Sequence, residues 1–480
     1  MRVILILSMV LVGLMPFSAL AQKSNFEWLD VFELEYASDP QFTDDGKSIV
    51  YVRNFMDIMK DRKRSNLWRV DLDGGNHRPI TSGLNNNASP RFSPDGSMLA
   101  YTSNASGNNQ VMMRLMDAGE TFEVAQLQNG ASRLTWSPDG QYIAFNAFVP
   151  GTDKTYAPLP NRPKGAEWAK NAIYIDKLQF RNDGRGFVKP GKSHVFVVPA
   201  MGGTPRQITS GEFNHSSSLS WAADGSMLYF SANRHDNHEM ETRDSEIYSV
   251  DVNSGDIKVL TSRFGPDGNP SVSPNGNLIA YSGYDDKRMG AHNTNIYVMN
   301  VDGSDVRNIT GDMDRSIGGF YWSYNGRELF YQYTDKGMGK IAKIDLKGKN
   351  TELADHVSGT SFGRPYASGA FNVSSKGDIA LTYATAMDQS NIGVTGSKGG
   401  DVKQITDLNG ELLNHRKLGS VEEVWYKSSH DGIDIHGWLV KPVDFDPAKK
   451  YPLILEIHGG PFSAYGPHFS AEIQLMANLY

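Results

Sequence analysis

The sequence contains no cysteine. Disulfide bridges, thiolate zinc sites and a cysteine nucleophile are therefore excluded. The sequence also has fewer basic than acidic residues: 47 Lys and Arg against 54 Asp and Glu, which gives a net charge of −7. A general nucleic-acid binder needs a basic surface, so we expect no nucleic-acid partner. Long apolar runs are missing after the first 21 residues, and we expect no membrane span there.

The first 21 residues have a composition of their own. Arg2 precedes an apolar run that starts at Val3 and is broken by Pro16, and Ala19-Leu20-Ala21 places small residues where signal peptidase cuts. The run is short for a membrane anchor. The segment therefore predicts a signal peptide (1–21), cleaved before Gln22, and an exported protein that is periplasmic or secreted.

One short motif recurs seven times along the chain. In each copy an aromatic or apolar residue precedes a tight turn such as Ser-Pro-Asp-Gly, and an apolar run follows. The turn glycines lie 44 to 51 residues apart, except for one step of 85 residues. They are Gly46, Gly96, Gly140, Gly225, Gly276, Gly326 and Gly377. A constant period of this kind indicates a repeat architecture.

Each repeat predicts four strands. The motif gives two strands around a turn in which glycine supplies the positive φ. A second segment, such as NLWRVDLDGGNHRPITSG at 66–83, gives a strand, a Gly-rich turn and another strand. Four strands in roughly 50 residues form one propeller blade, so we predict an all-β, seven-bladed β-propeller over residues 22–419.

The long step carries an insertion. It runs from Pro150 to roughly Lys192 and is rich in proline, lysine and aromatic residues. Long loops in a regular array are often functional, and we interpret this one in that way.

The pattern changes after residue 420. VEEVWYKSS, an Asp-Gly turn and IDIHGWLVKP predict a hairpin, and residues 453–457 (LILEI) predict a short apolar strand that runs into His-Gly-Gly-Pro at 458–461. FSAEIQLMANLY then predicts the start of a helix. In α/β-hydrolases, a backbone N–H in the loop after the third strand helps to hold the oxyanion, and glycine lets the substrate carbonyl come close.

These blocks together carry a family resemblance. The repeated SPDG turns, RPKGAEW and LQFRNDGRGF in the insertion, and DGIDIHGWLVKP with HGGP resemble the prolyl oligopeptidase family of serine peptidases. The similarity is greatest to its acylaminoacyl peptidase and bacterial dipeptidyl peptidase branch. It implies a propeller that caps an α/β-hydrolase domain and admits only short peptides, with neither a cofactor nor a metal.

The resemblance also implies roles for particular residues. The amide of Gly460 is expected to donate to the oxyanion, and His458 is expected to orient the loop. If the insertion lines the substrate chamber, then Glu167, Trp168, Arg181 and Arg185 are the candidates for contact with substrate.

The family's serine, aspartate and histidine follow the HGGP block and have no counterpart here. We therefore expect residues 420–480 to be the incomplete N-terminal part of a hydrolase domain, and the 480 residues alone to be inactive. The alternative is a non-catalytic periplasmic propeller of the Tol-system type, which would lack both C-terminal blocks. Substrate specificity and oligomeric state stay open.

Two further motifs are interpreted as non-functional. Ser361 stands in a Gly-x-Ser-x-Gly match at 359–363, but Arg364-Pro365 follows where the nucleophile turn of a hydrolase requires a helix. His235-Asp236-Asn237-His238-Glu239 offers metal ligands at close spacing, and we interpret it as a solvated loop of blade four.

Overall fold

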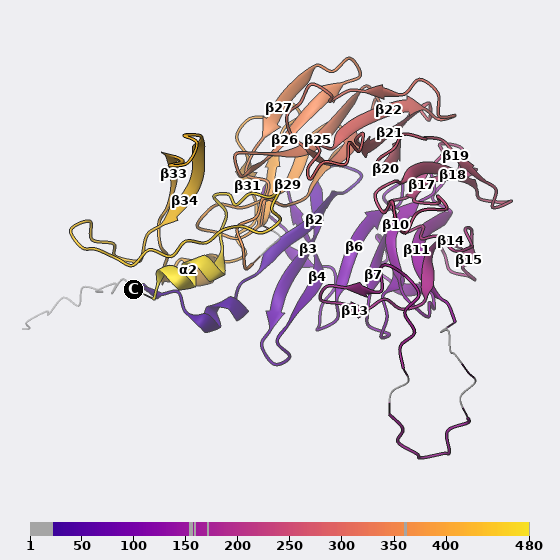
Figure 1. Cartoon of the computed structure of the whole chain (residues 1–480), viewed down its shortest axis with the longest axis horizontal. Coiled ribbons are helices and arrows are strands. Elements are labelled where there is room, and N and C mark those ends of the chain that lie inside the picture. Colours follow the sequence, from indigo (N-terminus) through magenta and orange to yellow (C-terminus); the bar gives the residue numbers. More distant parts are fainter. Residues whose placement is uncertain (1–22, 153–156, 158–159, 170–171, 360–361, 480) are drawn as a thin grey trace, which may run out of the picture.

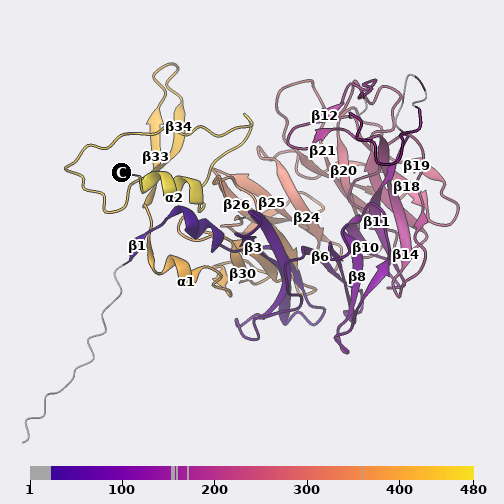
Figure 2. The same ribbon diagram turned by 90° about the horizontal axis from the view of Figure 1, so that it is seen from below.

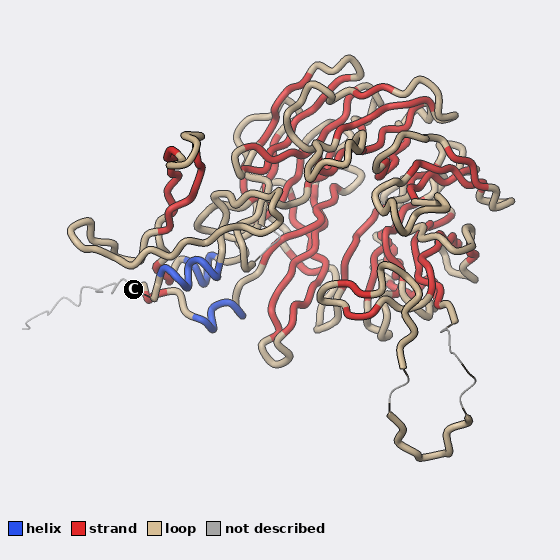
Figure 3. The backbone as a smooth tube through the Cα atoms, viewed as in Figure 1, coloured by secondary structure: helices blue, strands red, loops and turns tan. Residues whose placement is uncertain are grey.

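The computed structural model describes residues 23–152, 157, 160–169, 172–359 and 362–479. The expected signal peptide (1–21) lies outside these residues. Strands dominate the described chain (Figure 3), and its helical segments are η1 (Trp28–Phe32), α1 (Gly410–Leu413) and α2 (Ala471–Ala477). Within the described ranges, no helix has both the length and the apolar character needed to cross a membrane.

Seven four-stranded antiparallel sheets follow one another around a propeller in sequence order (Figure 1). Blade one contains β2 (Tyr36–Phe42), β3 (Ser48–Asp57), β4 (Arg62–Asp71) and β5 (Arg78–Pro79). Blade two contains β6 (Asn87–Phe92), β7 (Met98–Ser103), β8 (Gln110–Leu115) and β9 (Thr121–Ala125). Blade three contains β10 (Ala131–Trp136), β11 (Tyr142–Pro150), β14 (Gly191–Pro199) and β15 (Arg206–Gln207).

The remaining blades repeat the same order. Blade four contains β16 (Ser220–Trp221), β17 (Met227–Ala232), β18 (Glu246–Asp251) and β19 (Ile257–Val259). Blade five contains β20 (Asp267–Val272), β21 (Leu278–Gly283), β22 (Asn295–Asn300) and β23 (Arg307–Asn308). Blade six contains β24 (Ile317–Trp322), β25 (Glu328–Asp335), β26 (Met338–Asp345) and β27 (Asn350–Ala354). Blade seven contains β28 (Phe371–Val373), β29 (Ile379–Tyr383), β30 (Asn391–Thr395) and β31 (Lys403–Gln404). The predicted seven-bladed propeller is confirmed.

The recurring motif forms the turn between the first two strands of each blade. In blade three, the Ser137 hydroxyl donates to Asp139 (2.5 Å) and accepts from the Tyr142 amide (2.9 Å). Gly140 closes this turn with φ +69°, and all seven turn glycines have positive φ. The side-chain bonds of Ser and Asp or Asn thus hold the turn that the motif predicts.

The aromatic residue ahead of the turn ties neighbouring blades together. The indole N–H groups of Trp136, Trp221 and Trp322 donate to backbone carbonyls of the preceding blade at 2.9, 3.4 and 2.9 Å. Apolar clusters fill the spaces between blades: Met113 of blade two packs with Ile143 and Phe145 of blade three, and all three are fully buried. The core is therefore divided among the interfaces between blades.

The four strands of blade one are consecutive in the sequence, and so are the four strands of blade seven. The ring therefore closes without a blade that combines strands from both ends of the chain. Ala37 and Ser390 exchange hydrogen bonds of 2.8 and 3.0 Å across this junction. Ile49 and Tyr51 of blade one pack against Ala380 and Ile392 of blade seven. Beside this junction, β1 (Ser24–Asn25) pairs in parallel with β32 (Arg416–Lys417).

Residues beyond 420 lie outside the propeller ring, beside blades one and seven (Figure 2). The predicted hairpin is present as β33 (Val421–Lys427) and β34 (Asp434–Val440), and α2 forms at the predicted helix start. The predicted strand at 453–457 is wrong, since these residues form no ladder in the described chain. Leu453, Leu455 and Ile457 are 83%, 76% and 73% exposed, because no neighbouring strand covers them.

Candidate functional site

One face of the propeller receives the C-terminal segment. The turn between β25 and β26 contributes the Gly337 carbonyl, which accepts from His468 Nε2 at 2.9 Å. The loop between β29 and β30 contributes the Thr385 carbonyl, which accepts from the Phe469 amide at 2.8 Å. Burial lowers the pKa of His468 to about 4, so its imidazole is neutral near pH 7 and Nε2 carries the proton it donates.

The connection between blades six and seven holds this segment in place. We call residues 362–366 the clamp loop. Its carbonyls accept from the Ala471 amide (3.1 Å), the Ser470 hydroxyl (2.6 Å) and the Gly466 amide (2.9 Å). Tyr366 also forms an isolated antiparallel bridge with Tyr465, and the two rings meet edge to face at 4.8 Å. The backbone of the clamp loop thus fixes the whole stretch 465–471.

Arg364 is the charged centre of the clamp loop. Its guanidinium forms an ion pair with Glu456, which immediately precedes the Ile-His-Gly-Gly stretch, and a second with Glu472 at 3.0 Å. The same group donates to the Tyr465 hydroxyl at 3.3 Å. One side chain of the propeller therefore binds both the segment before the HGGP block and the helix after it.

Among the described residues, one hydrogen bond joins the glycines of the HGGP loop to the propeller. The Gly459 amide donates to the Tyr366 hydroxyl at 2.9 Å. Gly460 has φ +136°, and a Cβ there would lie 2.9 Å from the Phe462 amide nitrogen, so this position needs glycine. Among the described residues, no hydrogen bond uses the Gly460 amide. The loop thus presents a backbone N–H without an internal acceptor.

The insertion leaves the propeller on this same face. In each blade, the connection between the second and third strands lies at one end of the sheet, and in blades six and seven that end contacts the C-terminal segment. In blade three this connection is the insertion, which projects from β11 and β14 (Figure 1). The short hairpin of β12 (Arg181–Asn182) and β13 (Gly186–Phe187) is the ordered ladder within it.

The four proposed chamber residues all lie on this exposed extension. Arg181 begins β12, Arg185 lies in the turn after it, and Glu167 and Trp168 precede the hairpin. Trp168 is 46% exposed. Among the described residues, no hydrogen bond or ion pair joins any of the four to Gly460. The four residues therefore lie on the face that also receives the C-terminal segment, and their role in substrate binding stays a prediction.

Ser361 lies outside the described residues. The residues directly after it, however, form the clamp loop, which sequence reasoning did not select. The signal was present in the same motif, because Arg364-Pro365-Tyr366 puts a charge, a rigid turn former and an aromatic ring into a connection between blades.

Comparisons with known proteins agree with this architecture. Residues 33–157 match the TolB beta propeller domain model, and residues 176–289 match the dipeptidyl peptidase IV N-terminal region. The uncharacterized peptidase YuxL of Bacillus subtilis is 26% identical over 463 residues, which cover 93% of this chain and 68% of the relative. Dipeptidyl-peptidase 5 of Porphyromonas gingivalis is 23% identical over 461 residues, covering 92% of this chain and 65% of the relative.

The solved structures give the same answer for the fold. An acylaminoacyl peptidase in complex with Z-Gly-Gly-Phe-chloromethyl ketone superposes with a TM-score of 0.75 at 20% identity, covering 94% of this chain and 65% of that one. The chain thus spans about two thirds of the length of these relatives. The propeller, the clamped HGGP loop and the named relatives support a peptidase of the prolyl oligopeptidase family.

Proposed function

We propose that this chain is the propeller and the first catalytic-domain segment of an exported serine peptidase. The enzyme would release dipeptides or acylated amino acids from short peptides. The names of the relatives support the peptidase class, and the signal-like residues 1–21 support export. The observation that carries the proposal is the HGGP loop held against the propeller face with the Gly460 amide unused.

We assign the Gly460 amide to the oxyanion hole. Attack on a peptide carbonyl develops negative charge on its oxygen, and a fixed backbone N–H stabilises that charge without reorganising. Removing one such donor typically costs about 100- to 1,000-fold in kcat. The neighbouring Gly459 amide already donates to the Tyr366 hydroxyl. Of the two glycine amides, Gly460 is therefore the one free to donate to the oxyanion.

On this proposal, the remaining catalytic groups would follow Tyr480. By the family resemblance, a serine nucleophile, a histidine base and an aspartate follow Tyr480, within about 200 further residues. Such a domain would supply strands to cover the exposed Leu453, Leu455 and Ile457. The insertion, with Glu167, Trp168, Arg181 and Arg185, would then line the chamber between propeller and hydrolase and bind the peptide.

The experiment is to read the gene past the codon for Tyr480 and express the longer product. We expect a Gly-x-Ser-x-Gly turn within roughly 100 codons, labelling by a fluorophosphonate, and turnover of a dipeptidyl or N-acyl aminoacyl chromogenic substrate. The 480 residues alone should show neither reaction. In the longer product, replacing Gly460 should lower kcat more than KM. A frame that stops at Tyr480 in the gene, or a longer product without serine reactivity, would reject the proposal.

The second candidate is a propeller that binds partners without catalysis. The match of residues 33–157 to the TolB propeller model favours it. Against it stands the segment beyond residue 420, which Arg364 and the clamp loop join specifically to the propeller. The same fluorophosphonate labelling separates the two, since a binding propeller would not react.

A further inference from the structure

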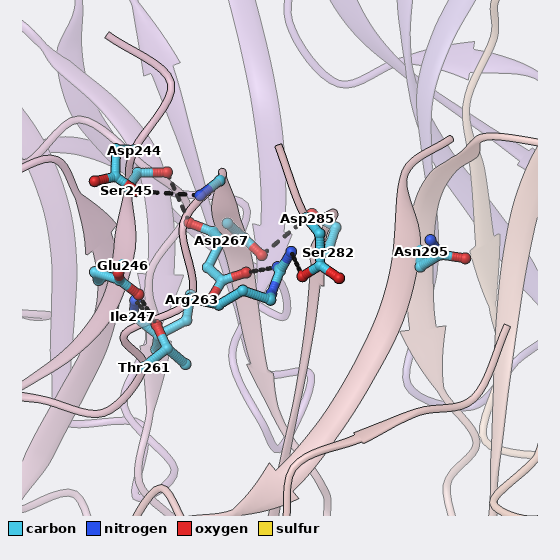
Figure 4. Close-up of polar contacts among 12 residues, drawn as sticks. Asp244, Ser245, Glu246, Ile247, Thr261, Arg263, Asp267, Ser282, Asp285 and Asn295 are labelled. Atoms are coloured by element: carbon cyan, nitrogen blue, oxygen red, sulfur yellow. Dashed lines mark hydrogen bonds and ion pairs between the residues drawn. The ribbon is translucent and has the colours of Figure 1, made fainter. Parts of the chain in front are cut away.

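A second cluster of chemically active side chains lies in blade four, outside the HGGP loop. The loop 233–245 joins β17 to β18, and its two ends bring three residues together: His235, Asp244 and Glu246. One ligand atom from each lies within 4.8 Å of the other two. Figure 4 shows the two carboxylates beside Thr261, Arg263 and Asp267.

The two distances from His235 are close to those between ligand atoms around a shared ion. His235 Nε2 lies 3.6 Å from an Asp244 oxygen and 3.7 Å from a Glu246 oxygen. Both separations are too long for a hydrogen bond, which an imidazolium would form with one oxygen at about 2.8 Å. Ligand atoms in a tetrahedral site with bonds of 2.0–2.1 Å are about 3.3–3.5 Å apart, close to the observed values.

The cluster also contains buried polar atoms without partners. His235 Nε2 is inaccessible to solvent and has no hydrogen-bond partner within the described part of the chain, although it lies near the two carboxylates. The Glu246 side chain is only 2% exposed; one of its oxygens accepts from Thr261 and the other faces His235. Asp267, fully buried, likewise has one carboxylate oxygen with no partner. Buried polar atoms are normally satisfied, so the unpartnered His235 Nε2 beside two carboxylates calls for a ligand.

The negative charge at the cluster is poorly balanced by the protein. Arg263, the arginine beside the cluster, forms its ion pairs with Asp267 and, at 3.2 Å, with Asp285. Asp244 and Glu246 therefore rely on His235 alone for an ion pair with an opposite charge among the described residues. A divalent cation would supply the missing charge and the missing bonds together.

From this geometry we propose that His235, Asp244 and Glu246 bind a divalent transition-metal ion of the zinc type. One imidazole nitrogen with two carboxylate oxygens is a donor set for such ions, whereas Ca²⁺ and Mg²⁺ prefer oxygen alone. Three protein ligands leave a fourth position for water. The site does not depend on the proposed peptidase activity.

The ion would cross-link the two ends of the loop 233–245. That loop forms ion pairs with two neighbouring segments. Glu239 pairs with Lys177 of the insertion at 3.0 Å, and Glu241 pairs with Arg288 of the loop between β21 and β22 at 2.8 Å. Binding of the ion would therefore stabilise the loop that Lys177 of the insertion contacts. This gives the metal a structural role on the propeller face.

The test is titration of the EDTA-stripped, tag-free chain with Zn²⁺ by calorimetry, with metal counting after dialysis. We expect one Zn²⁺ per chain, a rise in the unfolding temperature and slower proteolysis within 233–245. His235→Ala and Asp244→Asn should each weaken binding by about tenfold or more. His238→Ala is the matched control and should bind normally, because its Nδ1 faces the His235 carbonyl rather than the cluster.

Three results would overturn the proposal. They are no saturable Zn²⁺ binding, full stoichiometry retained in both His235→Ala and Asp244→Asn, or tighter binding of Ca²⁺ or Mg²⁺ than of Zn²⁺. Unfolding curves in EDTA establish that each variant is folded. Asp244→Asn keeps the size of the side chain and removes its charge. If His235→Ala does not fold, the Zn²⁺ affinity of Asp244→Asn tests the proposal.

Discussion

The Gly459 amide donates a 2.9 Å hydrogen bond to the hydroxyl of Tyr366, a residue 93 positions earlier in the chain. The first glycine of the HGGP loop is thereby tied to the connection between blades six and seven. The propeller thus helps to shape the loop that we assign to the oxyanion hole, in addition to its expected role as a cap.

Tyr366→Phe should loosen this loop and leave the propeller intact. The variant keeps the ring contact with Tyr465 and loses the one hydroxyl that accepts from Gly459. We expect faster hydrogen–deuterium exchange in peptides spanning 456–463 and an unchanged unfolding temperature of the propeller. Tyr324→Phe, at a 75% exposed position of blade six, is the control. Unchanged exchange in the Tyr366 variant would show that the hydrogen bond does not restrain the loop.

Arg364→Ala should detach the C-terminal segment more broadly. It removes the ion pairs with Glu456 and Glu472 on both sides of the HGGP loop. The guanidinium is partly exposed, so we expect a loss of about 1 kcal/mol in local stability rather than global unfolding. Limited proteolysis should cut between 441 and 466 sooner than in the wild type. Arg315→Ala, which breaks an ion pair with Asp335 within blade six, should leave that cleavage rate unchanged.

Two turn glycines with the same backbone angle should respond differently to alanine. Gly96 and Gly140 both have φ +69°, so alanine at either position would cost about 1 kcal/mol for the left-handed conformation. A Cβ at Gly140 would lie an ordinary 3.6 Å from Pro94, whereas a Cβ at Gly96 would lie 2.6 Å from the Cβ of Asp44. We expect Gly96→Ala to lower the urea midpoint more than Gly140→Ala. Equal midpoints would mean that Asp44, in the turn of blade one, moves away from the added methyl group at no cost in stability.

The repeat made the propeller predictable from sequence. Each blade carries its own turn chemistry, as Ser137, Asp139 and Gly140 show, and local hydrogen bonds suffice to build it. The expected strand at 453–457 could not be judged in this way. A strand needs neighbours to pair with, and an apolar run such as Leu453-Ile454-Leu455 reads the same whether or not those neighbours are present.

The sites were harder to predict because they join distant positions. Gly460 could be selected from a local motif, but its anchor Tyr366 could not, since nothing in the spacing of 93 residues connects them. His235 was noticed beside His238 and Glu239, yet its structural partners are Asp244 and Glu246 at the far end of the loop. The β-ladder that sets Ala232 opposite Glu246 brings these ends together.

Trp168→Ala should separate binding from folding in the insertion. The indole is 46% exposed, so its removal should leave the unfolding temperature unchanged. In the longer, active product it should raise KM or change the preferred peptide length if the insertion lines the chamber. Trp28→Ala, at a 66% exposed position of η1, is the control for loss of an exposed indole. An unchanged profile across dipeptide and longer substrates would remove the insertion from the binding site.

The pH dependence of stability should contain a contribution from Asp388, in the loop between β29 and β30. Burial, together with the nearby Asp407 carboxylate, raises the pKa of Asp388 to about 6. Its oxygens accept from Asn391 at 2.8 Å and Asn409 at 3.3 Å, which offsets only part of the cost of charging it. The folded state therefore holds this proton more tightly than the unfolded state does.

The sign follows from that difference in proton binding. An acid with a raised pKa stabilises the fold at low pH, and that stability is lost as the pH rises from about 4 to about 6. Asp388→Asn cannot ionise, so its unfolding free energy relative to wild type should improve by about 1–3 kcal/mol between about pH 4 and pH 7. Asp302→Asn is the control with the opposite sign: the Ser304 hydroxyl lowers the pKa of that exposed carboxyl, so its contribution to stability is lost as the pH falls below about 4. If the two variants shift in parallel with pH, then the Asp388 carboxyl is not held in its neutral form by the fold.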